Sequence, residues 1–428
     1  MITFGNYSVE GNSLCLQGRK LSDMAREYGT PLYVYDEDYI RDNARRFKNS
    51  FERGKNIVTY AGKAFLTLEI CRIMAQEGLS LDVVSSGELY TAWKAGFPME
   101  RVLFHGNNKT REEIELGVEL GIGRFVADNF RELRLIDEIS RSRGKVTSVI
   151  LRITPGIDAH THDYIKTGMI DSKFGFSIVD KEYIKAAKYA QELENVDLKG
   201  IHCHIGSQIF DLDPFYDAGG VMLGLYKEIM DETGAQLEEL DMGGGFGCYY
   251  IDGDNPLEIE EYVETILKSA SENAARLGIK EPRLIIEPGR SMVNNSCVTL
   301  YSVGAIKEIP GVKKYVAVDG GMADNIRPAL YQAQYDAVLV DRVEDDRVET
   351  VAIAGKSCES GDILINEIKM PLIEEDEILA VLYTGAYGYS MASNYNLIRK
   401  PAVIFVSKND VKVAVRRQTY EDMLKEQL

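Results

Sequence analysis

Eight short apolar runs, each followed by a stretch of helical periodicity, constrain the fold of this 428-residue chain more than any other feature. The runs are rich in β-branched residues, and their alternation with helical stretches predicts parallel strands joined by crossover helices. Eight is the number of strands that closes a (β/α)8 barrel of the TIM type. We therefore expect an α/β barrel with strands at residues 57–63, 79–85, 102–106, 125–128, 147–153, 198–205, 237–242 and 284–287.

The pattern changes after about Ser291. Long helical stretches disappear and strand-like runs follow one another closely, which predicts an all-β domain, an antiparallel β-barrel or sandwich. The opening segment carries two further strand-like runs and is expected to join this domain. The sequence thus predicts an N-terminal segment at 1–35, a barrel at 36–290 and a C-terminal β domain at 291–428. The expected β-domain strands are 2–4, 31–35, 298–305, 314–318, 347–354, 377–382 and 400–406.

Charge and cysteine content narrow the range of functions. The 49 Lys and Arg residues against 67 Asp and Glu give a net charge of -18, which would repel nucleic acids and anionic membrane surfaces. No apolar run approaches the roughly 18 to 20 residues that span a bilayer, and residues 1–7 do not resemble a signal peptide. The six cysteines stand singly, which favours reduced thiols over disulfides or structural zinc. We expect a cytoplasmic protein that binds neither nucleic acid nor membrane.

Reactive side chains follow the predicted strands at the ends where (β/α)8 barrels place their active sites. They include an amine, an imidazole, a glycine cradle and a carboxylate–arginine pair on separate strands, which together form a working set. A solvated barrel rim, which also shows such residues now and then, is the alternative. The residues are Lys63, Asp82, His105, Asp128, Arg152, His204, Gly243, Gly244, Gly245, Glu287 and Arg290.

Three of these motifs favour a specific chemistry. Lys63 in "TYAGKAF" has apolar or small neighbours, so its ammonium should be partly desolvated, as Schiff-base chemistry requires; a lysine that reaches solvent is the alternative. The glycine triplet in "LDMGGGFG" offers backbone N–H groups that could hold a phosphate, or simply makes a tight turn. The motif "IEPGR" places Glu287 and Arg290 three residues apart, as a functional pair or a surface ion pair.

The motif "HCHIGSQ" places His202 and His204 on the same side of one strand. Metal hydrolase barrels often begin with such a pair, which makes zinc one interpretation. That pattern needs further histidines on later strands, and the chain has none after His204. The other interpretations are an imidazole stacked on a planar cofactor and a buried histidine bonded to backbone.

Taken together, the motifs resemble the fold-type III pyridoxal-phosphate decarboxylases, from "PLYVYD" at Pro31 to "SNYNLIRKPA" at Ala402. The resemblance implies pyridoxal 5'-phosphate as the cofactor. Lys63 would form the Schiff base, His204 would stack on the pyridine ring, and Glu287 would bind its nitrogen. The remaining implied cofactor residues are Asp82 near the Schiff base, Ser207, Gly243, Gly244, Gly245, Gly289 and Arg290 toward the phosphate, and Tyr387.

Three motifs beyond the barrel, "VDGGMADNIRPALY", "GKSCESGD" and "GAYGYSMASNYN", resemble the family's substrate and proton-donor segments. By this resemblance Cys358 would be the acid and Glu359 would bind a distal ammonium. The alternatives are a rim ion pair for Arg327, a buried inert thiol for Cys358 and a core aromatic for Tyr387. The implied substrate-binding residues are Arg152, Arg290, Arg327, Tyr331, Glu359 and Tyr387.

The resemblance also implies a reaction. A carboxylate at the pyridine nitrogen, Glu287, suits decarboxylation better than racemisation, because it keeps the ring a good electron sink. Recognition of both an ammonium and a carboxylate at the far end favours meso-diaminopimelate, which would yield L-lysine and CO2. Ornithine, lysine, arginine or carboxynorspermidine-type substrates are the nearest alternatives. A metal-dependent barrel hydrolase and a non-catalytic cofactor-binding relative are the rivals from other classes.

The resemblance, together with the arrangement of the motifs, implies a head-to-tail homodimer with shared active sites. The lysine belongs to the barrel, whereas "GKSCESGD" belongs to the β domain. In a two-fold dimer such an exchange is reciprocal. Each site would then take Lys63 from one chain and Cys358 from the other.

Overall fold

The computed structural model describes residues 5–156 and 172–428. The chain divides into two compact units. The barrel unit comprises Asn43–Gly247 and Pro256–Gly289, and the β unit comprises the chain up to Asp42, Cys248–Asn255 and Arg290–Leu428. The boundaries predicted at residues 35 and 290 stay a prediction, and the observed division differs from them in grouping Cys248–Asn255 with the β unit.

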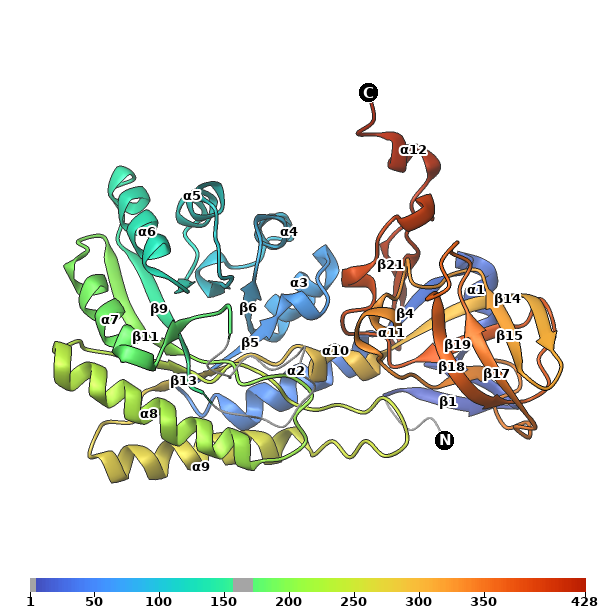
Figure 1. The fold of residues 1–428 in the computed structure, drawn as a ribbon, viewed down its shortest axis with the longest axis horizontal. Helices are drawn as coiled ribbons and strands as arrows, with labels where there is room; N and C mark the ends of the chain where they lie inside the picture. The colour runs from blue at the N-terminus through green and yellow to red at the C-terminus, as the bar shows by residue number, and fades with distance from the viewer. Residues whose placement is uncertain (1–4, 157–171) are drawn as a thin grey trace. The chain divides into compact units, whose positions relative to one another are not determined.

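Eight parallel strands form a closed sheet in the barrel unit, as predicted (Figure 1). Strand β13 pairs with β5, and β8 pairs with β9, so the first four strands and the last four close into a barrel. A short strand, β10 (Phe176–Ser177), pairs in parallel with the last residues of β9. The barrel strands are β5 (Ile57–Ala61), β6 (Ser80–Val83), β7 (Val102–Phe104), β8 (Arg124–Ala127), β9 (Thr147–Thr154), β11 (Val196–His202), β12 (Glu239–Asp241) and β13 (Arg283–Ile286).

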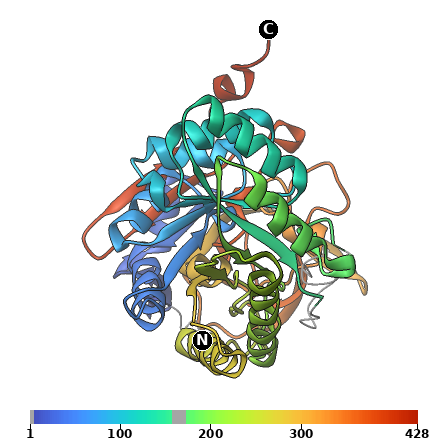
Figure 2. The same ribbon diagram turned by 90° about the vertical axis from the view of Figure 1, so that its left-hand side faces the viewer.

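Helices surround these strands (Figure 2). Their ends follow local sequence rules: the Thr67 side chain accepts from the Ile70 amide at the start of α3, and Gly78 ends that helix with a left-handed φ of 80°. Thr110 and Glu113 form a capping box at the start of α5. The helices are α3 (Leu68–Glu77), α4 (Ser86–Lys94), α5 (Arg111–Leu120), α6 (Phe130–Ser142), α7 (Glu182–Glu192), α8 (Asp213–Thr233) and α9 (Ile259–Leu277).

The two ends of the barrel strands differ in chemistry. At the amino ends Arg124 forms a bidentate pair with the buried Glu239, which Arg283 also contacts at 3.3 Å. A layer of apolar side chains fills the interior beside this cluster, and the polar groups of the candidate site follow the carboxyl ends. The apolar layer consists of Leu103, Val126, Ile150 and Ile285.

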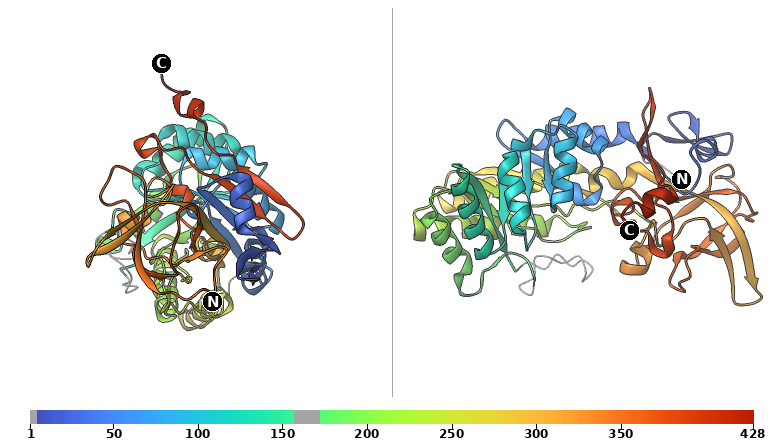
Figure 3. Two further views of the ribbon diagram at one scale, coloured as in Figure 1. Left: turned by 90° about the vertical axis from the view of Figure 1, so that its right-hand side faces the viewer. Right: turned by 90° about the horizontal axis from the view of Figure 1, so that it is seen from above.

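The β unit contains a strongly twisted sheet of mainly antiparallel strands (Figure 3). Strand β4 (Leu32–Asp36) pairs with β14 and β20, which confirms that the N-terminal part of the chain joins this unit. The predicted strand at 2–4 lies outside the described residues. Two pairings, β15 with β17 and β4 with β20, are parallel, so the unit is not purely antiparallel. The other strands are β1 (Tyr7–Glu10), β2 (Ser13–Leu16), β3 (Arg19–Lys20), β14 (Cys297–Ile309), β15 (Lys313–Val318), β16 (Ala337–Leu339), β17 (Glu349–Ala354), β18 (Ile363–Met370), β19 (Ile378–Leu382), β20 (Ala402–Val406) and β21 (Val411–Val415).

Short helices accompany the strands of the β unit, and α2 (Glu37–Phe51) continues from this unit into the barrel unit along the sequence. Within the described chain, every helix is too short or too polar to cross a membrane. The short helices are α1 (Leu21–Tyr28), α10 (Arg290–Val293), α11 (Arg327–Tyr331) and α12 (Tyr420–Leu424).

Candidate active site

Lys63 lies in a single 3-10 turn, Gly62–Ala64, directly after β5. Two hydrogen bonds to backbone carbonyls fix this turn: the Ala61 amide donates to the Pro288 carbonyl at 3.1 Å, and the Tyr60 hydroxyl donates to the Phe65 carbonyl at 2.6 Å. The lysine itself is half-buried between buried neighbours. The turn therefore presents one partly desolvated amine at the carboxyl end of a barrel strand.

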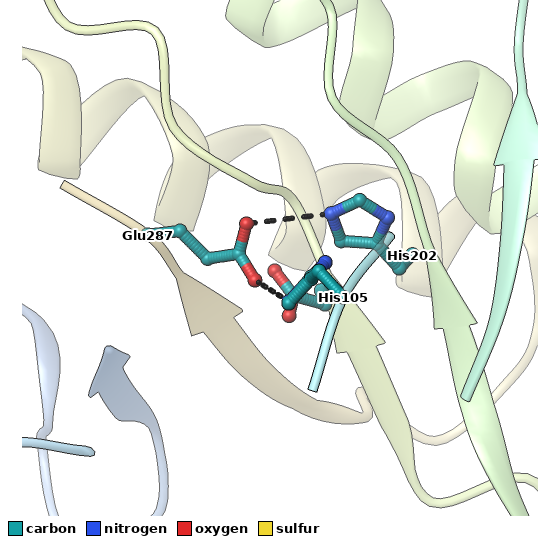
Figure 4. A group of neighbouring side chains, drawn as sticks. His105, His202 and Glu287 are labelled. Atoms are coloured by element: carbon teal, nitrogen blue, oxygen red, sulfur yellow. Dashed lines mark ion pairs between the residues drawn. The ribbon is translucent and has the colours of Figure 1, made fainter. Parts of the chain in front are cut away.

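Glu287 follows β13 and is faced by two imidazoles from other strands (Figure 4). Nε2 of His105, which follows β7, lies 2.7 Å from Oε1, and Nε2 of His202, the last residue of β11, lies 3.4 Å from Oε2. The two rings meet edge-on with centroids 5.0 Å apart. All three side chains are buried. The barrel thus brings together residues that are far apart in the sequence.

Burial and these contacts set the charges of the cluster. Burial alone would raise the pKa of Glu287, but His105 and His202 outweigh it and hold that pKa well below the usual range. Burial lowers the pKa of His202 to about 3, and the adjacent Glu287 opposes this decrease. Burial raises the pKa of Asp82, and burial together with the Glu287 charge raises the pKa of Asp241 well above the usual range. Glu287 is therefore the carboxylate of this cluster that carries the charge.

His204 and the glycine loop lie beside this cluster. The Gly244 amide donates to Nδ1 of His204 at 3.2 Å. Burial, and next the charge of Lys63, hold the pKa of His204 well below its usual value. A side chain at Gly243 would place a Cβ 2.4 Å from the Cys203 carbonyl, and φ there is +65°, so this position requires glycine. Gly245 and Ser207, the latter half-buried, complete the loop region.

Arg152 lies in β9 and pairs with the strand-end residue Asp128, with Nε 3.9 Å from Oδ1. Its guanidinium stacks over the Phe174 ring at 4.2 Å, and burial lowers its pKa. The Gly175 amide donates to the other oxygen of Asp128 at 2.9 Å. These contacts hold Arg152 at the barrel rim, and its predicted contact with substrate stays a prediction.

In the β unit, Tyr250 joins two buried arginines. Its hydroxyl accepts from Nη1 of Arg290 at 2.6 Å and from Nη1 of Arg327 at 3.0 Å. Arg327 also donates to the Tyr335 hydroxyl, and the Arg290 guanidinium lies 4.8 Å from the centre of the Tyr387 ring. Arg327 is buried, and the described hydrogen bonds of its side chain go to phenol hydroxyls and not to a carboxylate, so the alternative of a rim ion pair for Arg327 is wrong. Its predicted contact with a substrate carboxylate stays a prediction.

Cys358 and Glu359 are exposed residues of the loop between β17 and β18. Asp362 organises this loop, since its Oδ2 accepts from the Ser357 amide at 2.8 Å and its Oδ1 accepts from the Met322 amide at 2.6 Å. The alternative of a buried, inert thiol at Cys358 is therefore wrong. Tyr331, the last residue of α11, is half-buried.

Comparison with known proteins decides the family. The family model described as "Pyridoxal-dependent decarboxylase, pyridoxal binding domain" matches residues 37–294. A diaminopimelate decarboxylase of Bacillus subtilis is 51% identical over 404 residues, covering 94% of this chain and 92% of that protein. The chain belongs to the diaminopimelate decarboxylase family.

Solved structures agree with this assignment. The structure of a diaminopimelate decarboxylase of M. jannaschii in complex with L-lysine has a TM-score of 0.93 and 36% identity, with 100% of this chain and 99% of that chain covered. A lysine/ornithine decarboxylase of Vibrio vulnificus in complex with cadaverine has a TM-score of 0.78 and 22% identity, over 90% of this chain and 97% of that one. The second similarity shows the fold alone.

The residues present fit the pyridoxal 5'-phosphate of this decarboxylase family. Neither imidazole N–H is aligned with its Glu287 oxygen, so Nε2 of His105, Nε2 of His202 and Oε1 of Glu287 lack hydrogen-bond partners among the described residues. Buried polar atoms need partners, and a heteroaromatic ring nitrogen would provide one. By distance alone His105, His202, Asp241 and Glu287 could instead hold a metal ion, since one atom of each lies within 4.8 Å of the others.

The sequence pattern did not single out several residues that lie around the candidate site. Asp241 precedes the glycine triplet, and an acidic residue inside an apolar strand was a usable signal. Glu88 in α4 was also missed. Burial and the charge of Asp82 raise the pKa of Glu88 to about 7, although the Val84 amide and Lys63 lower it. Tyr250 and Tyr335 had no detectable signal, because only the tertiary fold brings them to the arginines.

Proposed function

We propose that the protein removes one α-carboxylate of meso-2,6-diaminopimelate as CO2 and releases L-lysine, the last step of lysine biosynthesis, with pyridoxal 5'-phosphate as cofactor. The observation that carries this proposal is that the buried Glu287, which has an imidazole near each carboxylate oxygen, follows β13, while Lys63 follows β5, the neighbouring strand of the barrel. The relative that has been solved with L-lysine supports the product.

When bound, the cofactor supplies an electron sink for the electrons that remain on Cα after CO2 has left. Lys63 would hold it covalently, and Glu287 would bind its ring nitrogen and keep that nitrogen protonated. His204 would lie against the ring face, with Asp82 near the reactive amine. The residues that would hold its phosphate are Ser207, Gly243, Gly244, Gly245, Gly289 and Arg290, with Tyr387 in contact with cofactor and substrate.

The β unit would recognise and protonate the substrate. Arg327 and Tyr331, together with Arg290 and Arg152, would bind carboxylates, because paired guanidinium groups suit planar anions. Glu359 would bind the distal ammonium and exclude substrates without one. Cys358 would donate a proton to Cα, a role that requires an accessible thiol, and the exposed position of Cys358 supports it.

We include a homodimer with shared sites in this proposal. Cys358 and Glu359 are exposed on a loop of the β unit, where a second copy of the chain could meet them. Each site would combine Lys63 of one chain with Cys358 of the other. We also propose a cytoplasmic location, since none of the six cysteines, all of which lie in the described part of the chain, forms a disulfide, which suits a reducing compartment.

Two experiments test this proposal: identification of the lysine that binds the cofactor, and measurement of CO2 release from several candidate substrates. Borohydride reduction of the purified, yellow, cofactor-loaded protein and peptide mapping should place the label on Lys63. Release of CO2 should then be fastest with meso-diaminopimelate among a panel that includes ornithine, lysine and arginine. A label on another lysine would refute the cofactor assignment, and a preference for ornithine would refute the substrate assignment.

A further inference from the structure

The polar groups around Glu287 have a role that the proposed function does not assign. We propose that His105 and His202 are positioning residues that fix the carboxylate of Glu287 through both of its oxygens, and that Asp241 keeps its proton and is neutral. The proposal rests on the proposed function, because Glu287 needs a fixed orientation only if it binds the cofactor's ring nitrogen.

The first part follows from the placement of the two imidazoles. They come from β7 and β11, while Glu287 follows β13, and each imidazole approaches a different carboxylate oxygen, at 2.7 and 3.4 Å (Figure 4). A carboxylate contacted on one oxygen can still rotate about its last bond, whereas contacts on both oxygens oppose that rotation. The placement of one imidazole near each oxygen of Glu287 is therefore the observation that carries the first part.

The second part follows from the surroundings of Asp241. This side chain is fully buried, and its Oδ1 accepts from the Gly243 amide at 2.9 Å. Its Oδ2 has no hydrogen-bond partner among the described residues. One of its oxygens lies within 4.8 Å of Glu287 and both imidazoles. Two carboxylates so close together in a buried site do not both ionise, so one of them keeps a proton.

The contacts decide which carboxyl keeps the proton. Glu287 has an imidazole beside each oxygen, which stabilises its charged form. Asp241 has a donor on Oδ1 alone, which leaves Oδ2 to carry the proton. The pKa directions agree with this assignment: burial and the Glu287 charge raise that of Asp241, whereas the imidazoles lower that of Glu287. The cluster thus presents one negative charge, held in one orientation.

The assignment makes the choice of variants informative. Asparagine matches a protonated aspartate in shape, with an acceptor and a donor in the same places, but it cannot replace an ionised one. The side-chain amide of glutamine can likewise place an N–H donor near the position that Nε2 of histidine occupies. Leucine has no donor. Asp241→Asn against Asp241→Ala, and His→Gln against His→Leu at 105 and 202, therefore form matched pairs.

The experiment removes the cofactor from the full-length protein and titrates it back, with the dissociation constant and the absorbance maximum of the bound cofactor as readouts. We expect His105→Leu and His202→Leu to weaken binding about tenfold each, equal to about 1.4 kcal/mol, and to shift the maximum. The glutamine variants should recover affinity to within about threefold and restore the maximum. Asp241→Asn should behave as wild type, and Asp241→Ala should weaken binding about tenfold.

Two results would overturn the inference. One is an Asp241→Asn variant as impaired as Asp241→Ala, which would mean that Asp241 is a charged group. The other is unchanged affinity and absorbance in both leucine variants. If a leucine variant does not fold, nitrogen-15 spectra of the histidines in the wild-type protein serve as the test. The proposed contact requires the proton of His202 on Nε2. A proton on Nδ1 alone would refute the contact. Failure of the wild type to bind the cofactor would refute the proposed function instead.

Discussion

Glu88 allows a quantitative test of the electrostatics near the candidate site. It lies in the first turn of α4, and its Oε2 accepts from the Val84 amide at 2.7 Å. Burial raises its pKa from 4.5 to about 7, with Asp82 adding to the increase and the Val84 amide and Lys63 opposing it. Replacement by glutamine keeps an acceptor for the amide and removes the charge at every pH.

The sign and size of the effect follow from these pKa values. Between pH 4.5 and 7 the folded protein binds a proton that the unfolded chain has lost, so stability falls as the pH rises through this window. At about 1.4 kcal/mol per pH unit, the wild type should lose up to about 3 kcal/mol from this group. Glu88→Gln should therefore equal the wild type near pH 4.5 and be more stable at pH 8 by up to about 3 kcal/mol, a large part of the roughly 5 to 15 kcal/mol typical of proteins.

The assay is urea unfolding of the cofactor-free protein at pH 5 and pH 8. Trp93, the one tryptophan of the chain, lies in the same helix as Glu88, so its fluorescence reports the barrel unit. Glu112→Gln, at an exposed position of α5, is the matched control and should leave the pH dependence as in the wild type. If Glu88→Gln loses as much stability between pH 5 and pH 8 as the wild type does, Glu88 does not have a raised pKa in the folded protein.

Three further predictions concern the fold, the substrate and the dimer. Lys109→Met should destabilise the barrel unit by about 3 to 5 kcal/mol in the same urea assay, because Glu132, 3.0 Å from the ammonium and fully buried, would lose its partner; a loss below about 1 kcal/mol would contradict this. Glu359→Ala should raise KM for diaminopimelate about 10- to 100-fold without changing the absorbance of the bound cofactor, and an unchanged KM would disprove the assigned role. Lys63→Ala and Cys358→Ala, each inactive alone, should recover roughly a quarter of wild-type activity after dissociation and remixing, whereas subunit exchange without recovery would show that both residues act in one chain.

Much of the fold could be predicted because it depends on short-range patterns. Each of the eight predicted barrel strands overlaps an observed one, since β-branched runs between helical stretches have few other structures. Closure of the barrel then places the end of the first strand beside the end of the last. That is why Lys63 and Glu287, 224 positions apart in sequence, could be expected in one site.

The rest depends on tertiary contacts that no local pattern encodes. Tyr250 lies in the loop between β12 and α9, and its contact with two arginines exists because Cys248–Asn255 groups with the β unit. Asp241 could be recognised as an unusual acidic residue in an apolar strand. Whether its carboxyl group keeps a proton depends on how close Glu287 lies, which only the tertiary fold determines. The β-unit strands that were not predicted are mostly short, spanning five residues or fewer apart from β18, and pairing with neighbouring strands defines them. These strands are β1, β2, β3, β16, β18 and β21.

The most direct test of the proposed reaction is product formation from meso-diaminopimelate by the cofactor-loaded protein. We expect CO2 and L-lysine in equal amounts, in a reaction that depends on added pyridoxal 5'-phosphate and is abolished in Lys63→Ala. Loss of substrate without CO2, or CO2 release that persists at the wild-type rate in Lys63→Ala, would contradict it.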